Sequence, residues 1–221
     1  MSKEPQLSLY LGLEIPKNWT NTLIIHLPLI QIAPRPFYTP DILDAYHHLA
    51  HYSHLIFTSK TAVNLFYAYG NILNLSSKEL MNKPAIAVGS TTANAISAHQ
   101  GRVELVAEEE TAEGVVAVLE KLPLEKCSFF WPHAAGSRPV IRDFFQMERI
   151  RSVNYRECIF YETLPLRPAI HPDFDTIKEL IFTSPSTVDA FLEFFGPIPQ
   201  DKLLTAIGPV TRAYLEKNVN N

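Results

Sequence analysis

The chain has 221 residues, of which 47% are hydrophobic and 19% are charged, and its formal net charge is −4. This composition excludes a disordered chain, and the weak negative charge excludes a basic protein that binds nucleic acid. No apolar run approaches the roughly 18 residues that a membrane span needs, and residues 1–6 are not followed by the apolar stretch of a secretion signal. We therefore expect a cytoplasmic protein that binds neither nucleic acid nor a membrane.

Two cysteines, Cys127 and Cys158, stand alone in the sequence, without a second cysteine or a histidine at the spacing of a metal site. A disulfide scaffold and a zinc site are therefore not expected. Two free, buried thiols are typical of a protein in a reducing compartment.

Two apolar segments precede the first proline-rich segment of the chain. Residues 7–13 are predicted to form a first strand, and residues 23–32, rich in Ile and Leu, a buried parallel strand. Residues 33–37 contain two prolines, which favour an extended conformation. This segment is therefore predicted to be a linker between domains.

Residues 39–161 alternate between helical and strand patterns. Thr39, Pro40 and Asp41 predict a helix start, because they suit the cap, the first helical position and the positive end of the helix dipole. Such alternation indicates a parallel sheet with helices on both faces. The pattern predicts helices near 39–50, 60–69, 90–100, 111–121 and 138–147, and strands near 54–57, 84–88, 103–106, 128–131 and 153–161.

A second proline-rich segment, residues 164–168, predicts a return linker beside the first. We therefore expect an α/β protein with two lobes, each a parallel sheet flanked by helices, joined by a two-stranded linker with a cleft between them. The outer lobe would comprise residues 1–35 and 167–221, and the inserted middle lobe residues 38–163. In the outer lobe the pattern predicts strands at 177–182 and 203–207 and helices at 184–195 and 210–217.

One strand-to-helix unit occurs twice in the sequence. Leu-Ile-Phe-Thr-Ser at residues 55–59 recurs at residues 180–184, and a similar helical segment follows each copy. Further along, residues 87–92 match residues 206–211, and each of these segments contains a glycine turn. Because both pairs keep the same order, the sequence predicts a duplicated structural unit with one copy in each lobe.

The carboxyl ends of these repeated strands are predicted to bind anions. The hydroxyls of Thr58, Ser59 and Ser184 are placed to cap the next helix, whose free N–H groups attract negative charge. Gly89 and Gly208 end neighbouring strands, where a missing side chain lets a ligand approach the backbone. For each of these residues taken alone, the alternative is an ordinary role in starting a helix.

Together these segments resemble the uroporphyrinogen-III synthase family, from about residue 23 to the end of the chain. Each motif alone is weak, but six of them in the family's order are specific. The resemblance implies a two-lobed α/β fold. The motifs are Phe57-Thr58-Ser59 before Ala62-Val63, Val88-Gly89-Ser90-Thr91-Thr92-Ala93, Thr111-Ala112-Glu113-Gly114, Tyr161-Glu162-Thr163-Leu164-Pro165, Phe182-Thr183-Ser184-Pro185-Ser186 and Ile207-Gly208-Pro209.

The chain departs from the family pattern at three places. Residues 12–16 replace the usual Thr-Arg-Pro turn, so the helix after the first strand is expected to be lost or very short. Residues 131–136 carry His133 where the family usually has an Arg-Gly pair. The family commonly adds one more strand and helix after the Ile-Gly-Pro helix, so the outer lobe is expected to be trimmed at both ends.

The resemblance implies a lyase that closes the linear tetrapyrrole hydroxymethylbilane into uroporphyrinogen III, with loss of water and inversion of ring D. It implies a role in haem biosynthesis, without a cofactor and with substrate taken from hydroxymethylbilane synthase. We expect a monomer, because nothing in the sequence demands a larger assembly. The substrate carries eight carboxylates, which helix N-termini bind without net positive charge. Tyr161 matches the family's tyrosine and is the predicted catalytic residue, as the donor of a hydrogen bond or a proton. The predicted substrate-binding residues are Thr58, Ser59, Gly89, Thr92, Ser184, Ser186, Gly208 and Thr211.

Two other functions fit the same pattern. One is a non-catalytic two-lobed protein that binds small anions, and the other is a degenerate synthase that only binds or regulates. For Tyr161 the alternative is an aromatic residue that anchors the linker.

The remaining polar clusters are expected to face solvent rather than to hold a metal. His47, His48, His51 and His54 follow a helical spacing without an acidic or cysteine partner nearby. Residues 108–110 form an acidic loop that is also expected to be solvated. The sequence around His133 does not indicate its role.

Overall fold

The structure, a computed structural model, describes residues 7–16, 19 and 23–219. The chain divides into two compact units, which we call unit 1 and unit 2 and describe separately. The sequence predicts lobes with similar limits, at 1–35 with 167–221 and at 38–163. Unit 1 contains Met1–Ile32 and Thr163–Asn221, and unit 2 contains Ala33–Glu162.

The two predicted linkers are parts of two hydrogen-bonded strands, β3 (Ile30–Pro34) and β8 (Asn154–Pro165). The N–H of Arg35 donates to the carbonyl of Phe160 at 2.8 Å, and the N–H of Leu166 donates to the carbonyl of Leu29 at 2.7 Å. Proline lacks the N–H group that a ladder hydrogen bond needs, so it is found at the ends of strands and not in their middle. The proline-rich segments therefore lie at the ends of two extended, paired strands, in agreement with the predicted two-stranded linker.

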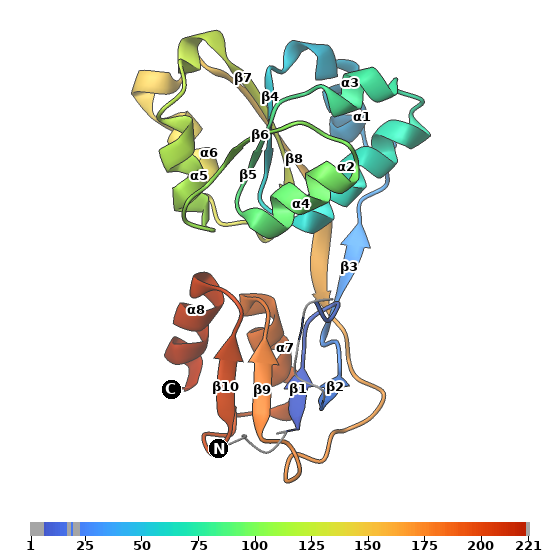
Figure 1. Cartoon of the computed structure of the whole chain (residues 1–221), viewed down its shortest axis with the longest axis vertical. Coiled ribbons are helices and arrows are strands. Elements are labelled where there is room, and N and C mark those ends of the chain that lie inside the picture. Colours follow the sequence, from blue (N-terminus) through green and yellow to red (C-terminus); the bar gives the residue numbers. More distant parts are fainter. Residues whose placement is uncertain (1–6, 17–18, 20–22, 220–221) are drawn as a thin grey trace. The chain divides into compact units, whose positions relative to one another are not determined.

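Unit 1 is a parallel sheet with the strand order β10-β9-β1-β2 (Figure 1). Two helices, which pack against each other, follow β9 and β10. Its core contains Leu9, Leu180, Phe182 and Phe191, all fully buried. The elements are β1 (Ser8–Tyr10), β2 (Ile24–His26), β9 (Glu179–Phe182), α7 (Pro185–Phe195), β10 (Leu203–Ala206) and α8 (Pro209–Val219).

The prediction of one buried strand over residues 23–32 is wrong. The run contains two strands, β2 and β3, with Pro28 between them. β2 lies at the edge of its sheet, so Ile25 is 40% exposed. The prediction failed because it rested on composition alone, and an apolar run does not reveal whether a strand is central or at an edge of its sheet.

Unit 2 has a sheet of the order β3-β8-β7-β4-β5-β6, in which the pairs from β8 to β6 are parallel. In Figure 1, α1 to α4 lie on one side of this sheet and α5 and α6 on the other. The expected parallel sheet with helices on both faces is thus confirmed. The elements are α1 (Pro40–His47), β4 (His54–Phe57), α2 (Lys60–Ile72), α3 (Ser77–Met81), β5 (Ala85–Ala87), α4 (Ser90–Ala98), β6 (Val103–Val106), α5 (Ala112–Leu119), β7 (Ser128–Ala134) and α6 (Val140–Gln146), with short 3-10 turns at Leu49–His51, Leu124–Lys126 and Glu148–Ile150.

Two details of the predicted helices differ in the structure. Thr39 stands at the cap position of α1, but its hydroxyl donates to the carbonyl of Pro36 at 2.6 Å and does not cap the helix. The short helix α3 was not predicted, although Ser76 and Glu79 form a complete capping box at its start. Pro40 and Asp41 occupy the predicted positions in the first turn of α1.

The predicted duplication is present in the backbone. In unit 2, β4 leads to α2 and the adjacent parallel strand β5 leads to α4. In unit 1, β9 leads to α7 and the adjacent parallel strand β10 leads to α8. Each copy therefore brings two helix starts to the carboxyl edge of its own sheet.

Two predictions concern residues outside the described part. Residues 1–6, where we expect no secretion signal, are outside it, as are residues 17–18 and 20–22, in the region of the shortened helix. Residues 12–16, which are described, form no helix. Among the residues that the structure describes, no helix combines the length and apolarity required to span a membrane.

Candidate functional site

A hydrogen bond joins Tyr161 to the helix start at Ser59. The Tyr161 hydroxyl lies 2.9 Å from Oγ of Ser59, and Ser59 caps α2 by accepting the N–H of Ala62 at 3.0 Å. β8 delivers the tyrosine and β4 delivers the serine, with β7 lying between these strands in the sheet. Two residues predicted for the site are therefore in direct contact in unit 2.

The environment of Tyr161 keeps its phenol protonated at neutral pH. The side chain is only 6% exposed, and burial raises its pKa above the ordinary value of a tyrosine. Hydrogen bonds with Ser59 and Thr61 act in the opposite direction. Tyr161 is thus suited to donating a hydrogen bond, whereas burial makes full proton transfer from it more difficult.

Thr58, the neighbour of Ser59, has a different role from the predicted cap. Its Oγ1 accepts a hydrogen bond from the indole Nε1 of Trp131 at 3.2 Å. Trp131 is almost fully buried in β7. The hydroxyls of Thr58 and Ser59 thus have different partners: Thr58 accepts from Trp131, whereas Ser59 accepts from the N–H of Ala62 and bonds Tyr161.

The glycine turn at Gly89 is occupied by a carboxylate of the chain itself. Oε1 of Glu110 accepts hydrogen bonds from the backbone N–H and the hydroxyl of Ser90, at 2.9 and 3.0 Å. A Cβ added at Gly89 would overlap the Glu110 carboxyl group, so the glycine permits this approach. The start of α4 therefore holds an anionic group of the chain itself, and the predicted binding of a ligand's anion there stays a prediction.

Residues 108–110 are exposed, as predicted for this acidic loop. The carboxylate of Glu110 in addition binds the positive end of α4, which was not predicted. Sequence patterns missed this residue, although β5 and β6 are neighbours and their following loops meet at one edge. The signal in the sequence that could have predicted this contact is the carboxylate of Glu110 in the loop that follows β6.

A Glu110→Ala variant is expected to lower the free energy of unfolding by about 0.5–1 kcal/mol, because a helix-start carboxylate is lost. It should also open the α4 start to added sulfate, which would shift the amide NMR signal of Ser90. Glu109→Ala is the matched control, since it removes a carboxylate from the same loop. If sulfate moves the Ser90 signal equally in the wild type and in Glu110→Ala, Glu110 does not occupy this position in solution.

Thr92 and Thr211 occupy equivalent places in the two repeats, and both are buried. Thr92 lies in the first turn of α4 and Thr211 in the first turn of α8, each with 4% of its surface exposed. Both therefore contribute to packing at the helix starts. Their predicted contact with a substrate stays a prediction.

The corresponding turns of unit 1 carry the other predicted residues. Ser184 caps α7 in a reciprocal capping box with Thr187, which donates its N–H to the Ser184 hydroxyl at 3.4 Å. Ser186 is the second residue of α7. Gly208 precedes α8 and, unlike Gly89, has open space where a Cβ would be. The α8 start is therefore sterically accessible.

Ser59→Ala and Ser184→Ala are each expected to lower the free energy of unfolding by about 1 kcal/mol, since each removes a helix cap. Only Ser59→Ala should raise the pKa of Tyr161 further, because the Ser59 hydrogen bond lowers that pKa. A pH titration of the tyrosine ring carbons by NMR would measure this shift. An equal Tyr161 pKa in both variants would contradict the Ser59 contact.

The histidines near α1 mostly form the expected solvated face. His47, His48 and His51 are exposed. Their predicted lack of an acidic neighbour is wrong for His48, whose Nδ1 lies 3.3 Å from Oδ1 of Asp44, one turn earlier. Within the described ranges, no group of three or more His, Cys, Asp or Glu side chains is arranged to hold a metal ion.

His54 differs from the other three histidines because it begins β4 and is half-buried. Its ring stacks on Phe129, and its Nε2 lies 3.8 Å from Oε1 of Glu104. Burial lowers the pKa of His54. It therefore belongs to the packed sheet and not to a surface cluster.

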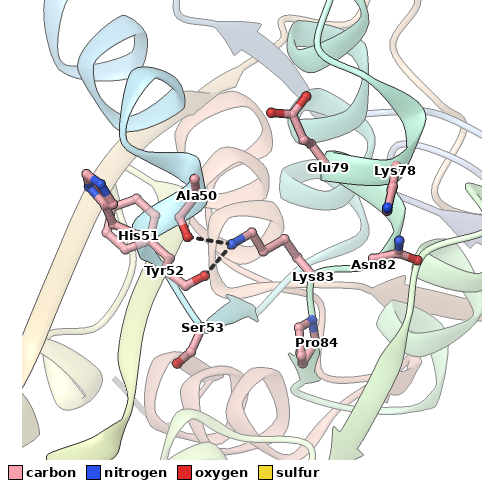
Figure 2. A pocket seen from close by; sticks show the side chains of 9 residues that line it. All are labelled: Ala50, His51, Tyr52, Ser53, Lys78, Glu79, Asn82, Lys83 and Pro84. Carbon is pink, nitrogen blue, oxygen red and sulfur yellow. Dashed lines mark hydrogen bonds between the residues drawn. The ribbon is translucent and has the colours of Figure 1, made fainter.

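A hollow with a volume of about 490 Å³ lies at the opposite edge of the unit 2 sheet, beside the starts of β4 and β5. Figure 2 shows the side chains that line it. The ammonium of Lys83 donates to the carbonyls of Ala50 at 3.1 Å and Tyr52 at 2.5 Å. None of the predicted site residues lines this hollow. Because ligands of parallel sheets bind at the carboxyl ends of strands, we assign Lys83 a structural role.

Comparison with protein-family models gives a match over residues 23–219 to the family described as Uroporphyrinogen-III synthase HemD. The matched range contains every residue predicted for the site.

Two relatives carry the name "Putative uroporphyrinogen-III synthase". The protein from Methanocaldococcus jannaschii is 27% identical over 181 residues, which cover 75% of this chain and 70% of the relative. The protein from Methanothermobacter thermautotrophicus is 28% identical over 176 residues, which cover 74% of this chain and 68% of the relative.

Among solved structures, the chain is similar to uroporphyrinogen III synthase from the extremely thermophilic bacterium Thermus thermophilus. A mutant form matches with a TM-score of 0.62 and 17% identity, and the wild-type form with 0.52 and 16%. Each match covers 96% of this chain and 88% of the other. At this identity the similarity shows the fold alone.

Proposed function

The chain belongs to the uroporphyrinogen-III synthase family, and on this premise we propose that it cyclises hydroxymethylbilane to uroporphyrinogen III. The observation that carries the proposal is the family match along residues 23–219. The contact between Ser59 and Tyr161 supports it, because it places a protonated phenol at a helix start.

The proposed reaction removes one water and closes one ring. The hydroxyl of the substrate takes up a proton from solvent and leaves as water, and an azafulvene-type cation remains. The substituted carbon of ring D attacks this cation, and rearrangement of the resulting spiro intermediate inverts ring D. Loss of one proton to solvent then restores the aromatic pyrrole. In our proposal Tyr161 donates a hydrogen bond to the departing hydroxyl, and the protein otherwise acts by positioning the chain.

Helix starts would bind the carboxylates of the substrate. In unit 2 the proposed contacts are Thr58, Ser59, Gly89 and Thr92. The Glu110 carboxylate at the α4 start supports this part, because the turn accommodates a carboxylate, which a carboxylate of the substrate would displace. In unit 1 the proposed contacts are Ser184, Ser186, Gly208 and Thr211.

We further propose a monomeric lyase that needs no cofactor and serves tetrapyrrole and haem biosynthesis in the cytoplasm, with hydroxymethylbilane synthase handing over the substrate. The free thiols of Cys127 and Cys158 fit a reducing compartment.

The direct test supplies freshly prepared hydroxymethylbilane and separates the type I and type III products after oxidation. Spontaneous closure gives the type I product, so the buffer reaction is the blank. We expect predominantly type III product with the protein present. Only type I product, in the proportion found in buffer, would refute the proposed activity and favour a protein that binds anions without catalysis.

A further inference from the structure

A second cavity lies within unit 2, next to β8. It has a volume of about 210 Å³ and is lined by residues that include Arg35, Asp41, His133, Arg142 and Glu157. None of the residues predicted for the synthase site contributes to its wall. It therefore needs an explanation of its own.

His133 is the most unusual group in this wall. Its side chain is 2% exposed and stacks on Trp131, with ring centroids 4.1 Å apart. Nδ1 lies 2.8 Å from the carbonyl oxygen of Ala134. A carbonyl oxygen only accepts hydrogen bonds, so Nδ1 must carry the proton of this bond.

The other ring nitrogen of His133 is then a bare acceptor. Burial lowers the pKa of His133, so the ring is neutral at pH 7 and Nε2 presents a lone pair. Within the described part of the chain, Nε2 is buried and has no hydrogen-bond partner. An unsatisfied buried acceptor costs free energy, on the order of 1–3 kcal/mol.

A second acceptor lies beside Nε2. Oε2 of Glu157 is 3.7 Å away, which is too far for a hydrogen bond. Oε1 of Glu157 already accepts a hydrogen bond from Nε of Arg142 at 2.6 Å. Oε2 of Glu157 accepts one from the hydroxyl of Tyr155 at 2.8 Å. Two neighbouring acceptors without a donor between them are satisfied by a group with at least two N–H or O–H donors, such as a water molecule or, with a matching charge beside Glu157, a protonated amine.

The same cavity also has cationic groups. Arg142 and Arg35 are 41% and 38% exposed, respectively. Arg142 uses only Nε for its bond to Glu157, which leaves its terminal Nη groups unbonded among the described residues. A guanidinium binds a carboxylate with paired hydrogen bonds.

These groups disfavour two other kinds of ligand. A simple anion would face the lone pair of His133 and the charge of Glu157. The described residues provide no group of three or more ligating side chains for a metal ion.

We propose that this cavity binds a small zwitterion, with its ammonium group between Nε2 of His133 and Oε2 of Glu157 and its carboxylate on the guanidinium of Arg142. The ligand class is that of small amino acids, and the site is separate from the proposed synthase chemistry.

The test uses matched probes on the full chain labelled with ¹⁵N-histidine. Glycine, β-alanine and 4-aminobutyrate vary the distance between the two charged groups, whereas n-butylamine and butyrate each lack one group. We expect at least one zwitterion to shift the Nε2 signal of His133 and to bind about tenfold more tightly than either single-charge probe. The proposal would be overturned if butyrate or n-butylamine bound as tightly as the best zwitterion. It would also be overturned if no zwitterion shifted the Nε2 signal of His133.

Three variants complete the test. His133→Phe keeps a ring on Trp131 but removes the acceptor, and His99→Phe is its control, because His99 stacks on Tyr67 outside the cavity. Glu157→Gln removes the charge without removing the side chain. Binding should fall about tenfold or more in His133→Phe and Glu157→Gln and stay unchanged in His99→Phe. If His133→Phe does not fold, two other measurements test the proposal: zwitterion binding to Glu157→Gln, and the tautomer of His133 in the ligand-free protein. A proton on Nε2 in the ligand-free protein would refute the proposal.

Discussion

A Tyr161→Phe variant is expected to form uroporphyrinogen III about 100-fold more slowly than the wild type, as is typical when a positioned donor is lost. The substitution removes one oxygen atom and keeps the ring that packs in unit 2. Initial rates of type III product from fresh hydroxymethylbilane would measure the effect. Because the type I product forms without the enzyme, its share of the total should rise.

The control for this experiment is Tyr155→Phe. Tyr155 lies on the same strand and donates its hydroxyl to Glu157 at 2.8 Å, away from Ser59. It should retain wild-type turnover. If Tyr161→Phe also retained full turnover while the wild type made the type III product, Tyr161 would not be the donor, although the synthase activity would stand.

Gly114→Ala is expected to lower the free energy of unfolding by about 1–3 kcal/mol. Gly114 lies in the first turn of α5, where its N–H donates to the hydroxyl of Thr111 at 3.0 Å. A Cβ added there would overlap the backbone carbonyl oxygen of Glu109, which cannot rotate away as a side chain would. The expected sign is therefore opposite to the usual gain of about 0.5–1 kcal/mol from replacing a helical glycine by alanine.

Denaturation by urea would measure this change, with Gly136→Ala as the control. A Cβ added at Gly136 has open space around it, so its effect should stay within about 0.5 kcal/mol. Stabilisation of the protein by Gly114→Ala would show that the close approach of Glu109 is absent in solution.

Several elements followed directly from local patterns in the chain. β4 and β6 have the predicted limits, and the strand-to-helix repeat occurs in both units. The prediction of β4 succeeded because a buried parallel strand is a short apolar run. The helix starts at Ser59 and Thr111 were predictable because each residue caps its helix through a bond within three residues.

Other features could not be predicted because they depend on which strands are neighbours. The exposure of β2 follows from its edge position, and the occupied start of α4 follows from the pairing of β5 with β6. Neither pairing is encoded in the residues of one segment.

The sequence by itself determined the repeated unit, the α/β class and the residues at the strand ends, since these rest on apolar runs, caps and turns within a few residues of each other. Only the tertiary structure decided that Tyr161 bonds to Ser59 across 102 residues, that Glu110 occupies the turn at Gly89, and that His133 is buried with an unused lone pair. The physical reason is that these properties depend on strand order and burial, which arise only when distant segments pack together.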